Sequence, residues 1–384
     1  MAYRPRADAI VVGGGVAGLS VAFHLARRGH KVALLERREI GAEASGGLAD
    51  LLTTAADGRV DGPHVRLSRA GLEATLRLIP EIEEASGVDV ELRATPLLRL
   101  AFEESARAAL RDFAGRSDDS ENETWVDGEA LGRLCPGLPP RVLGAILAPR
   151  AHHLTLRRLL QATMAAAVRI GVTAHVSIEV TGFVRRDRRV LGVIDSAGGE
   201  WLADHVVVAN AAWGASLLRV LGVHLPLRPV RGQIMALDGT GRPTLEFILS
   251  PGSGYVVPKP GDRIVVGATH EEAGMQKSVT PLGMSHLARV ARATPPLPSL
   301  PIAETFVGFR PTSPNGMPLL GGLPGHDGLS LALGYGGHGI LLANICAEMI
   351  ARRIGGEDPG PLWNDFHAER TVSPTSSTPA GAGV

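Results

Sequence analysis

Hydrophobic and polar positions follow two different periods along the chain. Residues 9–12 form a short unbroken apolar run, which is typical of a strand buried on both faces. Glycines follow, and then apolar residues recur at the helical positions Val16, Leu19, Ala22, Phe23 and Ala26. Gly29 ends this helix, and "KVALLE" gives a second strand with Glu36 at its tip. The pattern predicts a strand–turn–helix–strand unit.

The same reading predicts further elements of both kinds. Two glycine- or proline-containing turns, at 198–199 and 260–262, predict hairpins, and residues 225–268 are rich in strand pattern. Later in the chain a strand leads through a glycine-rich turn at 334–339 into an apolar helix. The predicted helices cover residues 64–86, 105–115, 155–171 and 340–354, and the predicted strands include 97–102, 206–209 and 329–333.

Composition narrows the function classes. The chain has 384 residues, of which 45% are hydrophobic, 20% are charged and 4% are aromatic, and the net charge is zero. These values are typical of a soluble enzyme, and they argue against a nucleic-acid surface. Cys135 and Cys346 make no disulfide framework, so we expect two buried free thiols in a reducing, cytoplasmic setting. The pair His152–His153 lacks further ligands, which predicts a polar loop and no metal site.

The glycine-rich stretch after the first strand predicts a phosphate-binding turn. A signal peptide is the alternative, but four glycines interrupt the apolar run, which is also too short to span a bilayer. Gly13, Gly15 and Gly18 have the G-x-G-x-x-G spacing, in which they allow the tight turn, the approach of a pyrophosphate and close helix–strand packing. Glu36 is placed to accept hydrogen bonds from ribose hydroxyls. NAD and FAD both remain open at this point.

Several motifs together resemble the D-amino acid oxidase superfamily of FAD enzymes, most closely its glycine oxidase branch, which is associated with thiamine biosynthesis. They are "VVGGGVAGLSVAFHLARRGHKVALLE", "ASGG", "VVVANAAWGAS", "RPVRGQ", "GYVVPKPGDRIVVGAT", "FVGFRPTSPNGMPLLG" and "GYGGHGILLA". The last three in this order are the most specific. The resemblance implies an α/β plus α+β fold, with a Rossmann-like FAD-binding domain and a discontinuous antiparallel-sheet substrate domain.

The implied FAD domain consists of residues 1–88, 149–222 and 305–370, and the implied substrate domain of residues 89–148 and 223–304. Residues 371–384 are rich in Ser, Pro, Thr and Gly, and we expect them to be disordered.

The resemblance also implies the residues that hold FAD. The second glycine-rich turn would present a helix N-terminus to the flavin edge that becomes negative on reduction. His338 lies inside that turn, where it either assists as an imidazolium or only satisfies the turn backbone. No cysteine lies near "RPTSPNG", so we expect noncovalent FAD. The implied residues are Gly13, Gly15, Val16, Ala17, Gly18, Glu36, Arg37, Ser45, Gly46, Gly47, Val180, Gly336, Gly337, His338, Gly339 and Ile340.

Three further residues bear on the substrate. Arg310 ends an apolar strand, so its charge must reach water or meet an anion. Charge pairing alone favours an internal Asp or Glu, whereas the resemblance implies a clamp on the substrate carboxylate, with Tyr255 donating to the same group. His270 stands where the glycine oxidase pattern has an apolar pocket residue, and this departure leaves the exact substrate open.

The implied reaction is oxidation of a small amino acid, namely glycine, sarcosine or a D-amino acid. The α-hydrogen would leave as hydride to flavin N5, the imine would hydrolyse to a 2-oxo acid and ammonia, and O2 would reoxidise the flavin to give H2O2. A same-fold dehydrogenase using a quinone or carrier, an aromatic monooxygenase and a non-catalytic flavin-binding protein are the alternatives. We expect no nucleic acid, metal or membrane span, and a homo-oligomer is left open.

Overall fold

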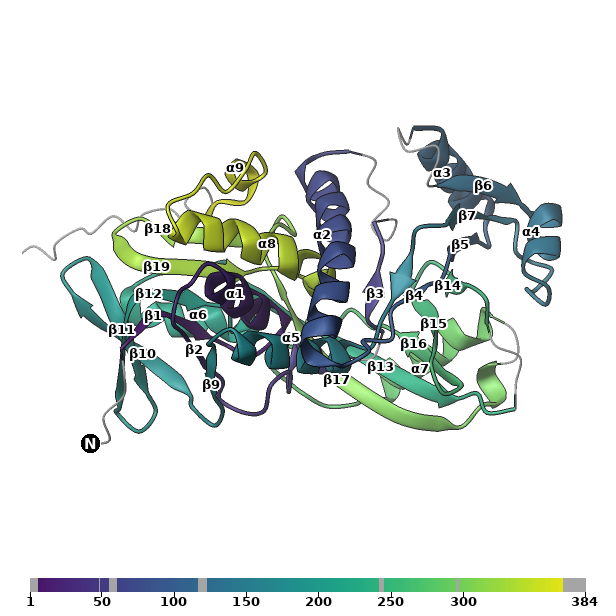
Figure 1. The fold of residues 1–384 in the computed structure, drawn as a ribbon. Coiled ribbons are helices and arrows are strands. Elements are labelled where there is room, and N and C mark those ends of the chain that lie inside the picture. Colours follow the sequence, from purple (N-terminus) through teal and green to yellow (C-terminus); the bar gives the residue numbers. More distant parts are fainter. Residues whose placement is uncertain are drawn as a thin grey trace, which may run out of the picture.

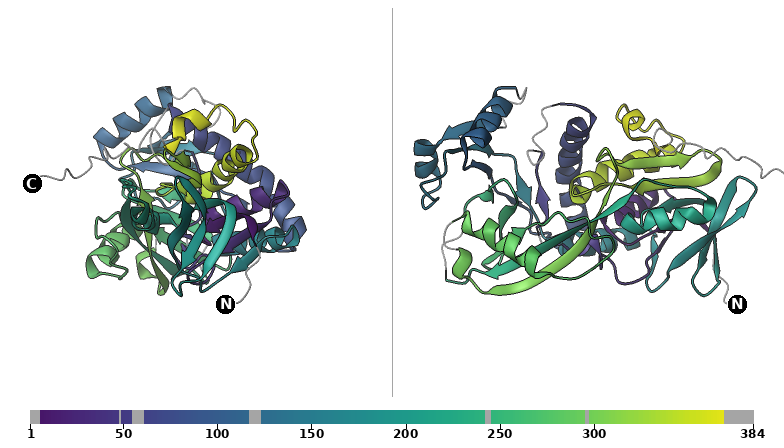
Figure 2. Two further views of the ribbon diagram at one scale, coloured as in Figure 1. Left: turned by 90° about the vertical axis from the view of Figure 1, so that its left-hand side faces the viewer. Right: turned by 180° about the vertical axis from the view of Figure 1, so that it is seen from behind.

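The computed structural model describes residues 6–47, 49–54, 61–116, 123–241, 245–294 and 297–368. The tail predicted at 371–384 lies outside these residues. Two eight-stranded sheets lie one at each end of an elongated molecule, and helix α2 stands between them (Figures 1 and 2). The helices are α1 (Val16–Arg27), α2 (Pro63–Ser86), α3 (Glu104–Arg116), α4 (Gly128–Leu134), α5 (Leu156–Arg169), α6 (Gly214–Leu218), α7 (Pro281–Arg292), α8 (Gly339–Ile354) and α9 (Trp363–Phe366).

The first sheet is the predicted nucleotide-binding type. Its strand order is β10-β11-β19-β12-β1-β2-β9, with β18 on β19, and β12, β1, β2 and β9 run parallel. Its strands are β1 (Ala7–Val12), β2 (Val32–Leu35), β9 (Thr173–His175), β10 (Val180–Arg186), β11 (Arg189–Asp195), β12 (Glu200–Val208), β18 (Leu319–Leu323) and β19 (His326–Leu333).

Burial on both faces explains the unbroken apolar run of β1. Ala9 and Val11 pack in one core cluster with helices α1, α2, α5 and α8, whereas Ile10 and Val12 pack in a second cluster on the opposite face. Side chains alternate between the faces of a strand, so a strand covered on both sides needs apolar residues throughout. The predicted Rossmann-like arrangement is therefore confirmed.

The second sheet has the order β17-β13-β16-β15-β14-β5-β7-β6. Its pairs are antiparallel except β14 with β5, so the predicted antiparallel sheet contains one parallel pair. The strands are β5 (Leu97–Ala101), β6 (Thr124–Asp127), β7 (Gly144–Ala148), β13 (Arg228–Asp238), β14 (Ile248–Ser250), β15 (Tyr255–Lys259), β16 (Arg263–Gly267) and β17 (Ile302–Thr312).

The division into two domains stays a prediction. Within the described residues, the second sheet draws its strands from two separate stretches of chain, as that division requires. The expected boundary at residue 305 falls inside β17, which pairs with β13 along its length.

Two smaller predictions were wrong. His152 and His153 are not a polar loop but form strand β8, which lies between β3 (Leu51–Leu52) and β4 (Arg93–Ala94) in a third sheet. Its partners are distant in sequence, so no local pattern marks it. Cys346 is buried in α8 as expected, but Cys135 is only partly buried, because it follows the end of the short helix α4.

Candidate functional site

The turn between β1 and α1 is shaped by its glycines. Gly13 has φ +113°, and a Cβ there would lie 2.7 Å from the carbonyl oxygen of Ala209 at the end of β12. A Cβ on Gly18 would lie 1.8 Å from the carbonyl oxygen of Gly13, so only glycine lets α1 pack this closely on the turn. Gly15 is the N-cap of α1, and a Cβ there would lie 3.0 Å from Ser45 Oγ. Side chains at Gly13 and Gly18 would therefore collide with protein backbone, so the turn itself requires glycine at both positions.

Glu36 stands directly after β2, beside this turn. Its Oε2 accepts a hydrogen bond from the N–H of Gly14 at 2.7 Å, and its Oε1 accepts one from the N–H of Arg38 at 2.8 Å. These bonds hold the carboxylate at the rim of the groove that the turn opens. A carboxylate oxygen has more than one lone pair, so each can accept a further hydroxyl donor.

A first cavity of about 280 Å³ runs along the carboxyl ends of β1, β2 and β12. Arg37 forms one side of it, with its guanidinium carbon 4.0 Å from the centre of the Trp213 ring and an ion pair of 2.9 Å to Glu43. Among the predicted cofactor residues, those that line it are Gly13, Gly15, Glu36, Arg37, Ser45 and Val180. Its shape and donors suit the adenosine and phosphates of a dinucleotide.

A second cavity of about 180 Å³ continues from the first. Both are lined by Gly15, Ala44, Ser45, Ala209 and Ala211, so the two form one groove across the tips of the strands. The second cavity brings together predicted residues from the whole length of the chain. They are Val16, Ala17, Gly47, Tyr255, Arg310, Gly336, Gly337, Gly339 and Ile340.

The second glycine-rich turn closes this cavity. Gly336 has φ +54°, and its N–H donates to the carbonyl oxygen of Pro311 at 2.9 Å, which ties the turn to the end of β17. His338 is the N-cap residue of α8, and its ring packs edge-on against His64, with 5.0 Å between ring centres. The helix N-terminus thus points its positive end toward the cavity wall.

Arg310 lies in β17 with its guanidinium over Gly232 of β13. A Cβ on Gly232 would lie 2.6 Å from Nη1, so this glycine leaves the space that the guanidinium occupies. Nη1 donates to the carbonyl oxygen of Thr269 at 3.0 Å. Within the described part of the chain, no carboxylate forms an ion pair with Arg310. The internal ion pair that charge pairing favoured is therefore not found there.

Tyr255 shares the cavity with Arg310. Burial raises the pKa of its hydroxyl, and the charge of Arg310 opposes that rise. Its ring covers Gly267, where a Cβ would lie 2.4 Å from the ring. The phenol therefore stays neutral and can donate a hydrogen bond to an anion that Arg310 binds.

Four predicted residues line neither cavity: Gly18, Gly46, His270 and His338, the last of which packs its ring against His64. Gly18 is buried under the first turn, and Gly46 is buried against the ring of Phe306, so both shape the groove from behind. His270 is exposed, whereas the preceding residue Thr269 is buried. The structure does not bring His270 together with Arg310 and Tyr255.

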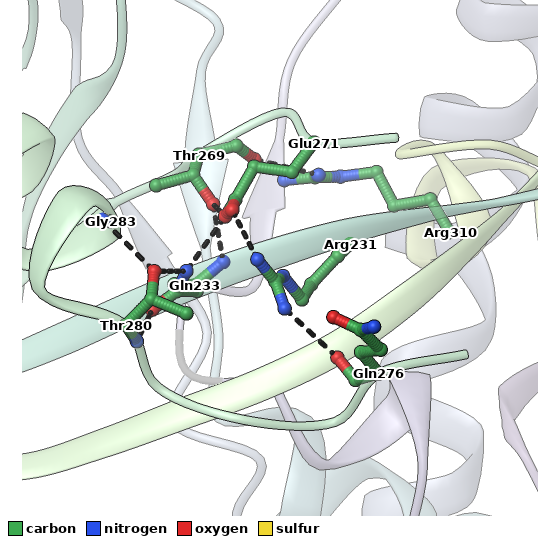
Figure 3. Close-up of polar contacts among 8 residues, drawn as sticks. All are labelled: Arg231, Gln233, Thr269, Glu271, Gln276, Thr280, Gly283 and Arg310. Carbon is green, nitrogen blue, oxygen red and sulfur yellow. Dashed lines mark hydrogen bonds and ion pairs between the residues drawn. The ribbon is translucent and has the colours of Figure 1, made fainter. Parts of the chain in front are cut away.

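A polar network behind Arg310 was not foreseen from the sequence (Figure 3). Glu271 accepts hydrogen bonds from Thr269 Oγ1 at 2.5 Å and from Gln233 Nε2 at 2.8 Å, and forms an ion pair of 2.5 Å with Arg231. Gln233 in turn donates to Thr280 Oγ1 at 2.9 Å. Burial acts to raise the pKa of Glu271, but these donors outweigh it and the pKa is lowered. The one sequence signal for this network was the alternation of the polar residues Arg231 and Gln233 in "RPVRGQ", which places both side chains on the same face of a strand.

No group of three or more metal-ligating side chains occurs among the residues that the structure describes. In the same residues, none of the helices combines the length and the apolar character needed to cross a bilayer.

Comparison with known proteins shows the family to which this chain belongs. Residues 8–353 match the DAO family of FAD dependent oxidoreductases. Glycine oxidase of Bacillus licheniformis is 32% identical over 375 residues, which cover 96% of this chain and 98% of that protein. The bifunctional protein ThiO/ThiG of Synechocystis sp. is 31% identical over 96% of this chain and 55% of its own length.

A solved structure agrees with these matches. The crystal structure of glycine oxidase from Geobacillus kaustophilus superposes with a TM-score of 0.91 at 26% identity, over 96% of this chain and 100% of that one. The chain therefore belongs to the DAO family of FAD-dependent oxidoreductases, and it is an enzyme of the amino acid oxidase type with FAD as its cofactor.

Proposed function

We propose that the enzyme oxidises the CH–NH bond of a small amino acid, namely glycine, sarcosine or a D-amino acid. The observation that carries this proposal is the guanidinium of Arg310, which lies in a cavity continuous with the nucleotide groove and has no carboxylate partner among the described residues. A substrate carboxylate is the ligand that this fork fits best, because it can accept two parallel hydrogen bonds.

The groove suggests how FAD would lie. Glu36 and Val180 would hold the adenosine end, the turn 13–18 and the N-terminus of α1 would hold the pyrophosphate, and Gly47 with Gly336–Ile340 would flank the flavin. The glycine turn fits this group, because Gly13 and Gly15 line the first cavity without side chains. We propose noncovalent binding, since neither Cys135 nor Cys346 lines either cavity.

The bound flavin would supply the acceptor for the α-hydrogen, which leaves as hydride. Arg310 and Tyr255 would fix the substrate through its carboxylate, so that the α-carbon is held against the flavin. The resulting imine would be hydrolysed by water to a 2-oxo acid and ammonia. The exposed side chain of His270 has no part in this proposal.

The electron acceptor in the proposal is O2, which would yield H2O2. The glycine oxidase relatives support an oxidase, and the match to the ThiO/ThiG protein supports a place in thiamine biosynthesis. A same-fold dehydrogenase is the second candidate, and the L-proline dehydrogenase of P. horikoshii shows that the fold also occurs in such an enzyme.

A panel of glycine, sarcosine, D-amino acids and L-proline, scored by anaerobic bleaching of the flavin, tests the substrate class. Bleaching by one of the small amino acids is the expected result, and bleaching by none of them would overturn the proposal. The reduced enzyme is then mixed with air in a stopped-flow instrument. Rapid reoxidation with release of H2O2 supports an oxidase, whereas slow reoxidation in air with rapid reoxidation by a quinone supports the dehydrogenase.

A further inference from the structure

A buried carboxylate lies in the wall of the cavity that holds Arg310. Asp50 follows the small-residue segment 44–47, and its side chain is only 6% exposed. It lines the second cavity together with Tyr255 and Arg310. Among the described residues that line this cavity, Asp50 is the one acid and Arg310 the one strong base. A zwitterionic amino acid carries the complementary pair of charges.

Contacts to Asp50 leave one oxygen available. Its Oδ2 accepts hydrogen bonds from the N–H of Leu156 at 3.0 Å and from Lys259 Nζ at 3.4 Å. Lys259 is also buried, and it donates to the carbonyl oxygen of Leu154 at 2.7 Å. In the part of the chain that the structure describes, no hydrogen bond to Oδ1 is found. Because Oδ1 is not a fully buried atom, it is open to the cavity, where a ligand can donate to it.

An amine must be neutral before its α-hydrogen can leave as hydride, but amino acids reach the enzyme mainly as ammonium ions. We propose that Asp50 binds the substrate ammonium and accepts a proton from it, an inference that rests on the proposed function. One N–H bond of the ammonium breaks, its electron pair stays on nitrogen, and an O–H bond forms on Asp50 Oδ1. The proton passes to water when the product leaves.

The surroundings of Asp50 favour this exchange. Burial raises the pKa of Asp50 and lowers the pKa of Lys259. A buried carboxyl with a raised pKa is a better proton acceptor than an exposed one. The titratable and charged groups that face Asp50 are Lys259, Tyr255 and Arg157, and those that face Lys259 in addition are Glu91 and His153.

Replacement of Asp50 by Asn tests the inference, because the amide keeps the shape and an acceptor for the Leu156 N–H. We expect unchanged FAD binding and a loss of about 100-fold in kcat/KM for the amino acid at neutral pH, the lower end of what a positioned base contributes. The variant should then depend on amine that is already neutral in solution. As the pH is raised toward the amine pKa, the kcat/KM of the variant should rise about tenfold per pH unit. The ratio of wild-type to variant kcat/KM should therefore fall.

A second measurement distinguishes loss of proton transfer from damage to the site where Arg310 binds a carboxylate. Acetate carries a carboxylate and no amine, and its binding is followed by perturbation of the flavin spectrum. Asp50→Asn should bind acetate at least as tightly as the wild type, because a neighbouring negative charge is removed. A deficit that stays constant across pH, or acetate binding that falls together with activity, would overturn the inference.

Two further variants test whether the loss of activity comes from an unpaired Lys259 or from removal of any nearby carboxylate. The double variant Asp50→Asn, Lys259→Met leaves no stranded buried cation, and it should show the same pH-dependent deficit. Glu304→Gln is the matched control, since Glu304 lies in the neighbouring cavity with Asp50 and Lys259 but does not line the one with Arg310. Its kcat/KM should stay near the wild-type value. If no amino acid bleaches the flavin of the wild-type enzyme, the proposed function itself is wrong. If the wild type is bleached but Asp50→Asn lacks the pH-dependent loss, only the inference about Asp50 is wrong.

Discussion

Arg310 Nη1 donates a hydrogen bond to the carbonyl oxygen of Thr269 at 3.0 Å. This bond uses one of the five guanidinium donors and is made to a neutral group, so the charge stays uncompensated by protein among the described residues. The contact fixes where the guanidinium lies and leaves its charge for a ligand.

Replacing Arg310 with Met should leave the fold and the flavin spectrum intact but lower kcat/KM for amino acids sharply. Loss of one partner of a desolvated charge pair costs about 2–5 kcal/mol, which is roughly 30-fold to several-thousand-fold. Amines without a carboxylate should lose much less. Steady-state kinetics with both substrate types, together with the melting temperature, provide the check. Equal losses for both substrate types with a lowered melting temperature would indicate a structural role instead.

Gly232→Ala should displace the guanidinium without removing it. The new Cβ would lie 2.6 Å from Nη1 and 2.9 Å from Cζ, and a flexible side chain yields more easily than a strand. A shift of about 1 Å can cost on the order of 100-fold in rate, so we expect a loss of that size with FAD retained. Gly132→Ala is the control, because a Cβ there meets nothing within 4 Å. Kinetics of Gly232→Ala that match those of Gly132→Ala would contradict the placement of Arg310.

The parts of the fold that could be predicted from the sequence are those determined by residues close together in the chain. The turn at 13–18 and the apolar run of β1 are each determined by neighbouring residues, and they were predicted within a few residues. By contrast, the parallel pairing of β14 with β5 joins residues about 150 positions apart, as Leu249 with Leu98 shows. Nothing in either segment specifies such a partner, because register between distant strands is determined by packing.

The same limit applies to the site. Arg310 and Tyr255 were found through resemblance, and the structure brings both to one cavity. Glu271 and Asp50 carry no local signal, since an isolated carboxylate in a loop usually faces solvent. Glu271 meets Arg231 and Gln233 only when β13 lies beside the segment after β16. Asp50 meets Lys259 across 209 positions of sequence.

Glu36→Arg should weaken FAD binding. Charge-assisted hydrogen bonds are worth about 1.5–3 kcal/mol each, so loss of the ribose contacts should raise the Kd for FAD by roughly 10- to 150-fold. Glu36→Gln should have a smaller effect, because the amide oxygen can still accept from the N–H of Gly14. Titration of apoprotein with FAD measures both, with Glu39→Arg on the exposed side of the same loop as control. An unchanged Kd for Glu36→Arg would show that Glu36 is not at the ribose.

Glu271→Gln should lower stability in a pH-dependent way. Glu271 pairs with Arg231, whose side chain is only 7% exposed, and loss of a hydrogen bond to a charged group costs about 1.5–3 kcal/mol. The folded-state pKa of Glu271 lies below its ordinary value of 4.5, so its stabilising contribution is present above that pH and is lost as pH falls through the folded pKa. Denaturant unfolding at pH 7 should therefore separate the variant from the wild type, and the difference should narrow below about pH 4.5. Because the carbonyl of Thr269 positions Arg310, kcat/KM should fall as well, and FAD binding should not. A stability difference that is the same at pH 7 and pH 4 would mean that the ionised carboxylate of Glu271 does not hold this network together.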